Sequence, residues 1–147
     1  MPVLETTTLI PDRTPDQVLD FCLDGVNFPK IFPERVTPLG DIDLANLRIE
    51  AGRQFRFRHW MFNVIPTHWT VVIREVGERH FIDEMLKGPM AAFRHEHRVA
   101  AGEGGTLYTD RVTYAAIGGA VVEWLLVDGY MRRIFEARHR NMLRLLR

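Results

Sequence analysis

The C-terminal stretch from Gly119 to Arg147 constrains the fold most, because its hydrophobic residues recur with the period of one long amphipathic helix. The apolar arc of this predicted helix comprises Val121, Trp124, Leu125, Val127, Met131, Ile134, Phe135, Met142, Leu143, Leu145 and Leu146. Asp128 and His139 project from within the same arc. Burying them against an entirely apolar core would be costly, so we expect the helix to close a partly polar cavity.

Most of the remaining chain alternates between apolar and polar residues, a pattern that predicts β-strands. The predicted strands span residues 3–10, 53–62, 68–76, 80–86, 93–99 and 106–114, with a weaker candidate at 36–42. Thr14 and Gln17 match a capping box with Pro15 at the first helical position, and a second short helix is expected at 27–32. Short connections between consecutive strands favour an antiparallel meander. The sequence therefore predicts one α+β domain, residues 1–147, with a curved antiparallel sheet of about six to seven strands wrapped around the long C-terminal helix.

Composition limits the classes of partner and chemistry. The formal net charge is +0, so nothing electrostatic indicates nucleic acid or an acidic membrane as a partner. The longest apolar run, residues 115–127, contains Glu123 and is too short for membrane insertion. The lone cysteine, Cys22, precludes an internal disulfide, and the lack of serine excludes a Ser-His-Asp nucleophile. We expect a cytoplasmic protein, and the sequence leaves a homodimer open.

Several polar residues are predicted to point into the sheet's covered face. On the strand 93–99, the period of two places His95 and His97 opposite a charged face, and therefore inward. If the following loop centres near residues 102–103, His95 lies across from Asp110 and His97 from Tyr108. Further inward candidates are Asp83 and Tyr114 on the strands, and Asp128 and His139 on the helix.

Three interpretations of this polar wall stay open. The residues can form satisfied pairs that hold the sheet in register, line a cavity that orients a polar group of a ligand, or form a metal or acid–base site. A His-x-His pair on a strand can present two imidazoles to one metal, with Asp83 or Asp110 completing the set. Because such pairs are common by chance, we assign no metal and no cofactor from the sequence.

The chain resembles the START-related, pollen-allergen-like superfamily (SRPBCC), in particular its bacterial polyketide cyclase/dehydrase-like branch. The residues that carry the resemblance are Leu9-Ile10-Pro11, Pro15, Val18, Phe21, Asn27-Phe28, Ile31, Pro33, Trp69, Ile73, Phe81, Asp83, Gly88-Pro89, Phe93, His95, His97, Gly105-Thr106, Asp110, Val112, Tyr114, Phe135 and Arg138. The resemblance implies a helix-grip fold with a cavity between sheet and helix. It also implies a hydrophobic ligand of lipid, sterol or polyketide type, and it carries no universal catalytic residue.

We therefore expect a protein that binds a hydrophobic or aromatic small molecule in an internal cavity. The expected ligand contacts are Phe55, Phe57, Trp69, Phe81, Asp83, Phe93, His95, His97, Tyr108, Asp110, Tyr114, Trp124, Asp128 and Phe135. An alternative is a cyclase, aromatase or dehydratase in which His95 or His97 is the acid–base group and Asp110 orients it. A second alternative is an interaction or regulatory module, for which a filled interior would argue.

Overall fold

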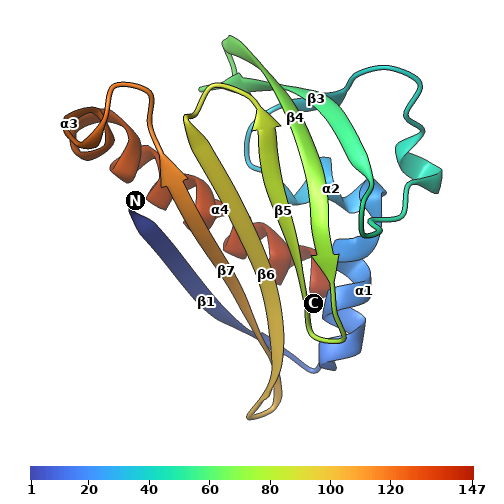
Figure 1. The fold of residues 1–147 in the computed structure, drawn as a ribbon. Helices are drawn as coiled ribbons and strands as arrows, with labels where there is room; N and C mark the ends of the chain where they lie inside the picture. The colour runs from blue at the N-terminus through green and yellow to red at the C-terminus, as the bar shows by residue number, and fades with distance from the viewer.

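The computed structural model describes residues 1–147 and contains a seven-stranded antiparallel sheet that curves around the C-terminal helix (Figure 1). The strands are β1 (Val3–Pro11), β2 (Val36–Pro38), β3 (Gln54–Met61), β4 (Ile65–Val76), β5 (His80–Lys87), β6 (Ala92–Gly102) and β7 (Gly105–Ala115). Their spatial order is β1-β7-β6-β5-β4-β3-β2. The predicted meander is confirmed, and the one non-sequential pairing brings β1 against β7.

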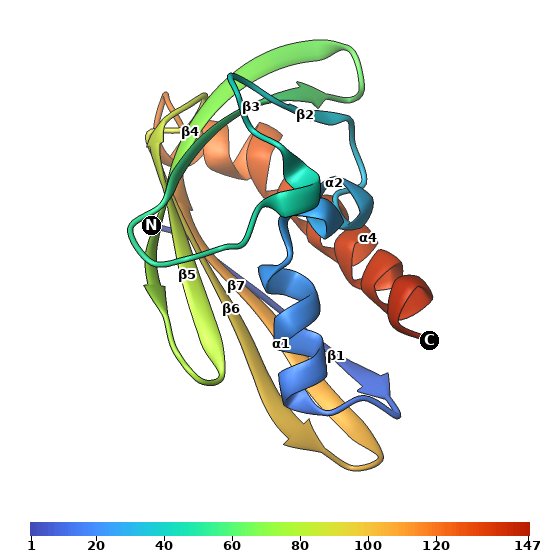
Figure 2. The same ribbon diagram turned by 90° about the vertical axis from the view of Figure 1, so that its right-hand side faces the viewer.

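The helices lie together on the concave side of the sheet (Figure 2). They are α1 (Pro15–Leu23), the 3-10 turn η1 (Gly25–Asn27), α2 (Phe28–Ile31), a second 3-10 turn η2 (Leu44–Asn46), and the C-terminal helical segments. The predicted capping box of α1 is present: the Gln17 backbone N–H donates to Thr14 Oγ1 at 3.2 Å, and the Thr14 N–H donates to Gln17 Oε1 at 3.0 Å.

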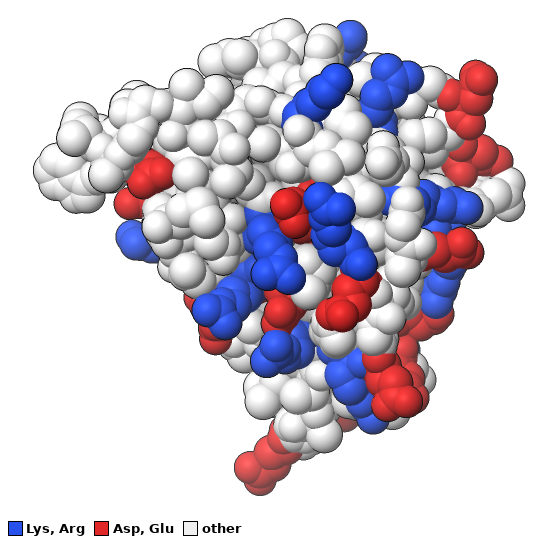
Figure 3. Space-filling model, viewed as in Figure 1, with Lys and Arg blue, Asp and Glu red and all other residues white.

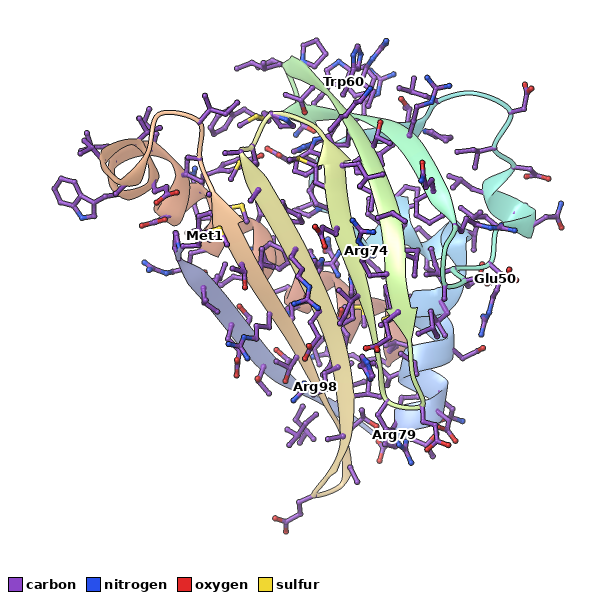
Figure 4. All side chains as sticks on the ribbon, viewed as in Figure 1. Met1, Glu50, Trp60, Arg74, Arg79 and Arg98 are labelled. Carbon is purple, nitrogen blue, oxygen red and sulfur yellow. The ribbon has the colours of Figure 1, made fainter.

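The convex face of the sheet carries interleaved charges of both signs (Figure 3). Arg74 of β4 and Arg98 of β6 belong to this face (Figure 4), and each pairs with a glutamate, Glu84 and Glu96 respectively. These pairs are solvent-exposed and contribute little stability. They show that the polar half of each strand pattern faces water, as the alternation predicts.

The C-terminal helix comprises α3 (Ala120–Val122), a π-helical turn η3 (Glu123–Val127) and α4 (Asp128–Leu146). From Met131 onward the predicted apolar arc is largely buried. The prediction for its first part is wrong, because Val121, Trp124 and Leu125 are 66%, 75% and 62% exposed. A π turn holds more residues than an α turn and rotates the preceding residues away from the phase of α4. The segment also projects beyond the edge of the sheet (Figure 1).

The register between β6 and β7 differs from the predicted one by two residues. His97 lies opposite Asp110, and His95 lies opposite Val112, because the hairpin turns at 103–104 between the paired Gly102 and Gly105. A slip of two residues keeps each side chain on its face of the sheet, whereas a slip of one would reverse it. The predicted inward direction of both histidines is therefore confirmed although their cross-strand partners were misassigned.

Candidate functional site

A cavity of about 550 Å³ lies between the curved sheet and the helices. Its 38 lining residues include 28 hydrophobic ones, and they come mainly from α1, α2, the loop around η2, strands β2 to β6, and the C-terminal helical segments. Phe62, Ile117 and Leu126 also line it although they are 52%, 65% and 72% exposed. The cavity therefore reaches the surface between the β3–β4 hairpin and the start of the C-terminal helix.

An aromatic cluster forms much of the apolar wall. The rings of Phe57 and Trp69 are stacked at 5.9 Å with an interplanar angle of 8°, and Phe93 meets Trp69 edge-on at 5.2 Å. These side chains come from β3, β4 and β6, where the period of two sends alternate residues inward. The arrangement offers flat apolar surfaces to a bound molecule.

One end of this wall is polar, where Asp83 of β5 faces His95 and His97 of β6. Nε2 of His97 lies 2.6 Å from Asp83 Oδ2, and Nδ1 of His95 lies 3.7 Å from the same oxygen. All three residues line the cavity. The stacked ring of Phe81, centred 3.8 Å from that of His97, and the perpendicular ring of Phe135, 5.1 Å from that of His95, hold the imidazoles in place.

Behind the two histidines, the fully buried carboxylate of Asp110 accepts four hydrogen bonds. Oδ1 accepts from His95 Nε2 at 2.6 Å and from the Tyr108 hydroxyl at 2.8 Å. Oδ2 accepts from His139 Nε2 at 2.9 Å and from Arg138 Nε at 3.3 Å. The donors come from β6, β7 and α4, so this one carboxylate ties the helix to the sheet.

The electrostatics follow from these contacts. Burial opposes the ionisation of Asp110, but the Arg138 guanidinium and the His95 ring outweigh it and hold the pKa of Asp110 well below its usual value. The pKa of Asp83 is likewise lowered, because the two neighbouring imidazoles outweigh burial. Burial and the charge of His95 lower the pKa of His97 to about 4, against the opposing effect of Asp83. Burial and the Asp110 charge raise the pKa of Tyr108 well above its usual value.

A second polar cluster lies elsewhere on the cavity wall. The buried His59 of β3 donates from Nε2 to Glu34 Oε1 at 2.7 Å, and the Tyr130 hydroxyl of α4 donates to the same oxygen. The Phe62 backbone N–H donates to Glu34 Oε2 at 2.6 Å. This cluster joins the segment before β2, the β3–β4 hairpin and the helix, and the sequence patterns gave no indication of it.

The structure separates the predicted ligand contacts into four groups. Those that line the cavity are Phe55, Phe57, Trp69, Phe81, Asp83, Phe93, His95, His97 and Phe135. Tyr108 and Asp110 are buried behind the wall, and Tyr114 donates its hydroxyl hydrogen to Asp128 away from the cavity. The assignment of Trp124 to the wall is wrong, since it points into solvent from the segment before α4.

The sequence analysis named Arg138 only as part of the family resemblance and did not place it at the site, but it is 4% exposed and lines the cavity. Its Nη2 donates to the Tyr108 hydroxyl oxygen at 3.2 Å in addition to its bond with Asp110. A signal for it existed, because Arg138 lies four residues after Ile134 and four before Met142, in the middle of the buried stripe. His139, whose inward direction was predicted, also bonds Thr8 Oγ1 of β1 at 2.7 Å.

A curved antiparallel sheet that grips a long C-terminal helix around a cavity defines the START-like, helix-grip class of fold. Solved structures agree with this assignment. Protein Ms6760 from Mycobacterium smegmatis superimposes with a TM-score of 0.75 at 14% identity, over 99% of this chain and 90% of its own. A START superfamily protein from the same organism gives 0.69 at 11% identity, over 97% of this chain and 98% of its own.

The di-domain ARO/CYC protein StfQ from the steffimycin biosynthetic pathway has the same fold, with a TM-score of 0.68 at 13% identity. It covers 98% of this chain, which corresponds to 49% of StfQ. No family profile matches the sequence, and no curated protein does. Identities this low establish the fold, while function depends on the site. None of the helices is both long and apolar enough to cross a membrane.

Proposed function

We propose that this protein binds a hydrophobic or aromatic small molecule, of lipid, sterol or polyketide type, in the cavity between sheet and C-terminal helix. The observation that carries the proposal is the cavity itself, whose volume of about 550 Å³ and mostly hydrophobic lining suit a small-molecule ligand. A cavity of this size also weighs against a pure interaction module, for which a filled interior was expected.

The distribution of polar groups suggests how such a ligand is oriented. Its apolar body packs on the rings of Phe57, Trp69 and Phe93. Its polar end lies toward Asp83 and His95, where a hydroxyl or carbonyl oxygen finds hydrogen-bonding partners in an otherwise apolar cavity. An amphipathic ligand with one polar end fits this arrangement best.

The three tryptophans provide a test. Trp69 lines the cavity, whereas Trp60 stacks under Arg35 outside it and Trp124 is in solvent. A brominated fatty acid, whose heavy atoms quench fluorescence only at contact, should quench the wild-type protein with saturation. Trp60→Phe and Trp124→Phe should retain that quenching and Trp69→Phe should lose it. Saturable quenching that survives in Trp69→Phe but disappears in Trp124→Phe would indicate that the ligand binds at the surface, which would contradict the proposal.

A second candidate function is acid–base catalysis, favoured by the pairing of His95 with Asp110. In the neutral ring, Asp110 holds the proton of His95 on Nε2, so Nδ1 is the basic atom on the cavity side. The fold shared with the ARO/CYC protein StfQ is consistent with such chemistry. If this reading holds, the protein should accelerate hydrogen–deuterium exchange at the acidic carbon of a bound aromatic 1,3-diketone, followed by NMR. His95→Gln should abolish that acceleration while leaving affinity within a few fold, and equal loss of both would argue against a catalytic role.

A further inference from the structure

We propose that Asp83, His95 and His97 form a binding site for one divalent first-row transition-metal ion, open toward the cavity. The three potential ligand atoms, Asp83 Oδ2, His95 Nδ1 and His97 Nε2, all lie within 4.8 Å of one another. Two of the separations are 2.6 Å and 3.7 Å. Tetrahedral ligands with metal bonds of about 2.0–2.1 Å lie about 3.3 Å apart, so small side-chain rotations bring these atoms to coordinating distance.

In metal sites, the imidazole nitrogen that does not bind the metal usually donates a hydrogen bond to a neighbouring group. Both histidines have such a neighbour for that nitrogen. His95 Nε2 donates to Asp110 Oδ1 at 2.6 Å, which leaves the lone pair of Nδ1 facing Asp83. His95 Nδ1 makes no hydrogen bond of its own, because the nearest carboxylate oxygen is 3.7 Å away. The ring is therefore fixed in the tautomer that a metal requires.

The same reasoning applies to His97 through Tyr108. The Tyr108 hydroxyl gives its hydrogen to Asp110 Oδ1, so its oxygen can accept from His97 Nδ1, 3.2 Å away. In that tautomer the lone pair of His97 Nε2 faces Asp83 Oδ2, 2.6 Å away, and a cation between the two atoms would replace the hydrogen bond that the other tautomer makes there. A metal ion satisfies both atoms.

The charge of the region supports a cation in the same place. When the imidazoles are neutral, the buried wall carries two negative charges, on Asp83 and Asp110, and one positive charge, on Arg138. Arg138 pairs with Asp110, while the two histidines are the only ion-pair partners of Asp83. An uncompensated carboxylate beside an apolar cavity is costly, and a bound divalent ion would neutralise it.

The donor set indicates which ions fit and what the site would do. Two imidazoles and one carboxylate suit Zn²⁺, Fe²⁺, Co²⁺ or Ni²⁺, and no thiolate is present to select a softer ion. Three protein ligands leave at least one coordination position free, as in catalytic rather than structural sites. All three residues line the cavity, so an oxygen atom of a bound molecule could occupy that position.

Cobalt titration of the chelator-treated full chain tests the proposal without any organic ligand. We expect one Co²⁺ per chain with visible d–d absorption, and displacement by Zn²⁺ measured calorimetrically. Asp83→Asn and His97→Gln should each lower the affinity by at least about 100-fold, and Tyr108→Phe by about tenfold or more. His59→Gln and His80→Gln are matched controls that remove imidazoles bonded to glutamates at other sites, and both should bind Co²⁺ like the wild type.

A wild-type measurement covers the case in which the variants fail to fold. Bound Co²⁺ should produce hyperfine-shifted NMR signals from the ring N–H protons of two histidines, and of no third histidine. No stoichiometric binding at micromolar metal, unchanged affinity in folded Asp83→Asn and His97→Gln, or loss of binding in His80→Gln would overturn the proposal. Because the fluorescence test above needs no metal, either proposal can fail alone. A metal on Nδ1 would also exclude His95 as a free general base.

Discussion

Replacing Asp110 with asparagine should destabilise the protein more than any other isosteric polar substitution on the sheet. The change preserves volume but removes the charge that faces the buried Arg138, whose only ion pair is with Asp110. It also replaces one acceptor oxygen with a donor NH₂ group. Each carboxylate oxygen now accepts two hydrogen bonds, so two of the four donors would then face another donor.

The magnitude follows from these losses. Removing one partner of a buried ion pair costs about 3–5 kcal/mol, because the remaining charge stays buried without compensation. A domain of this size has a free energy of unfolding of about 5–15 kcal/mol, so Asp110→Asn should fold but unfold at much lower denaturant. The double variant Asp110→Asn/Arg138→Met removes the stranded charge and should recover part of the loss, with a coupling of about 1–3 kcal/mol.

Urea unfolding followed by far-ultraviolet circular dichroism measures these differences. Asp128→Asn is a matched control, because Asp128 is only partly buried and accepts one hydrogen bond, from Tyr114. It should cost about 1 kcal/mol. If Asp110→Asn costs no more than Asp128→Asn, or if adding Arg138→Met worsens it additively, the carboxylate does not organise the buried network.

Three further predictions concern stability. The pKa of His97 is about 4 in the folded protein and 6.5 in the unfolded chain, so lowering the pH from 6.5 to 4 should reduce the free energy of unfolding by about 3 kcal/mol through this residue. Urea unfolding at several pH values should show a smaller loss in His97→Gln. Trp124→Ala should change the free energy of unfolding by less than about 0.5 kcal/mol, whereas Met142→Ala, at a fully buried site, should cost about 2–5 kcal/mol. Gly105→Ala should destabilise the protein by about 1–3 kcal/mol, because the added Cβ would lie 2.1 Å from a main-chain oxygen of β1. Gly129→Ala, in open space on α4, should slightly raise the melting temperature.

The fold was predictable because it rests on periodicities that survive local error. The alternation in β6 and β7 placed His95, His97, Tyr108 and Asp110 on the covered face, and the two-residue slip in register left that face unchanged. The residues that were expected to lie opposite each other, His95 with Asp110 and His97 with Tyr108, are still within hydrogen-bonding distance, because their side chains reach diagonally across the strands.

The errors arose where a periodicity changes phase or where burial and charge conflict. Trp124 was placed inside because a constant helical phase was extended through the π turn at Glu123–Val127. Arg138 was not placed at the site because charged residues on a helix are usually solvated, although its position between Ile134 and Met142 is a buried one. The cavity depends on how far the sheet curves from the helix, a distance that no local pattern encodes.

The buried network is better understood as a positioning device than as a source of stability. Well-packed hydrophobic residues often stabilise a core as well as a buried ion pair does, so stability alone would not favour Asp110 and Arg138 there. Their effect is local: with Tyr108 and His139 also bonded to Asp110, rotation of the carboxylate is blocked, and the ring of His95 cannot flip without losing its 2.6 Å bond. The free Nδ1 therefore keeps one direction, toward Asp83 and the cavity. A ligand, a proton or a metal ion each requires that fixed direction, and an apolar core would not provide it.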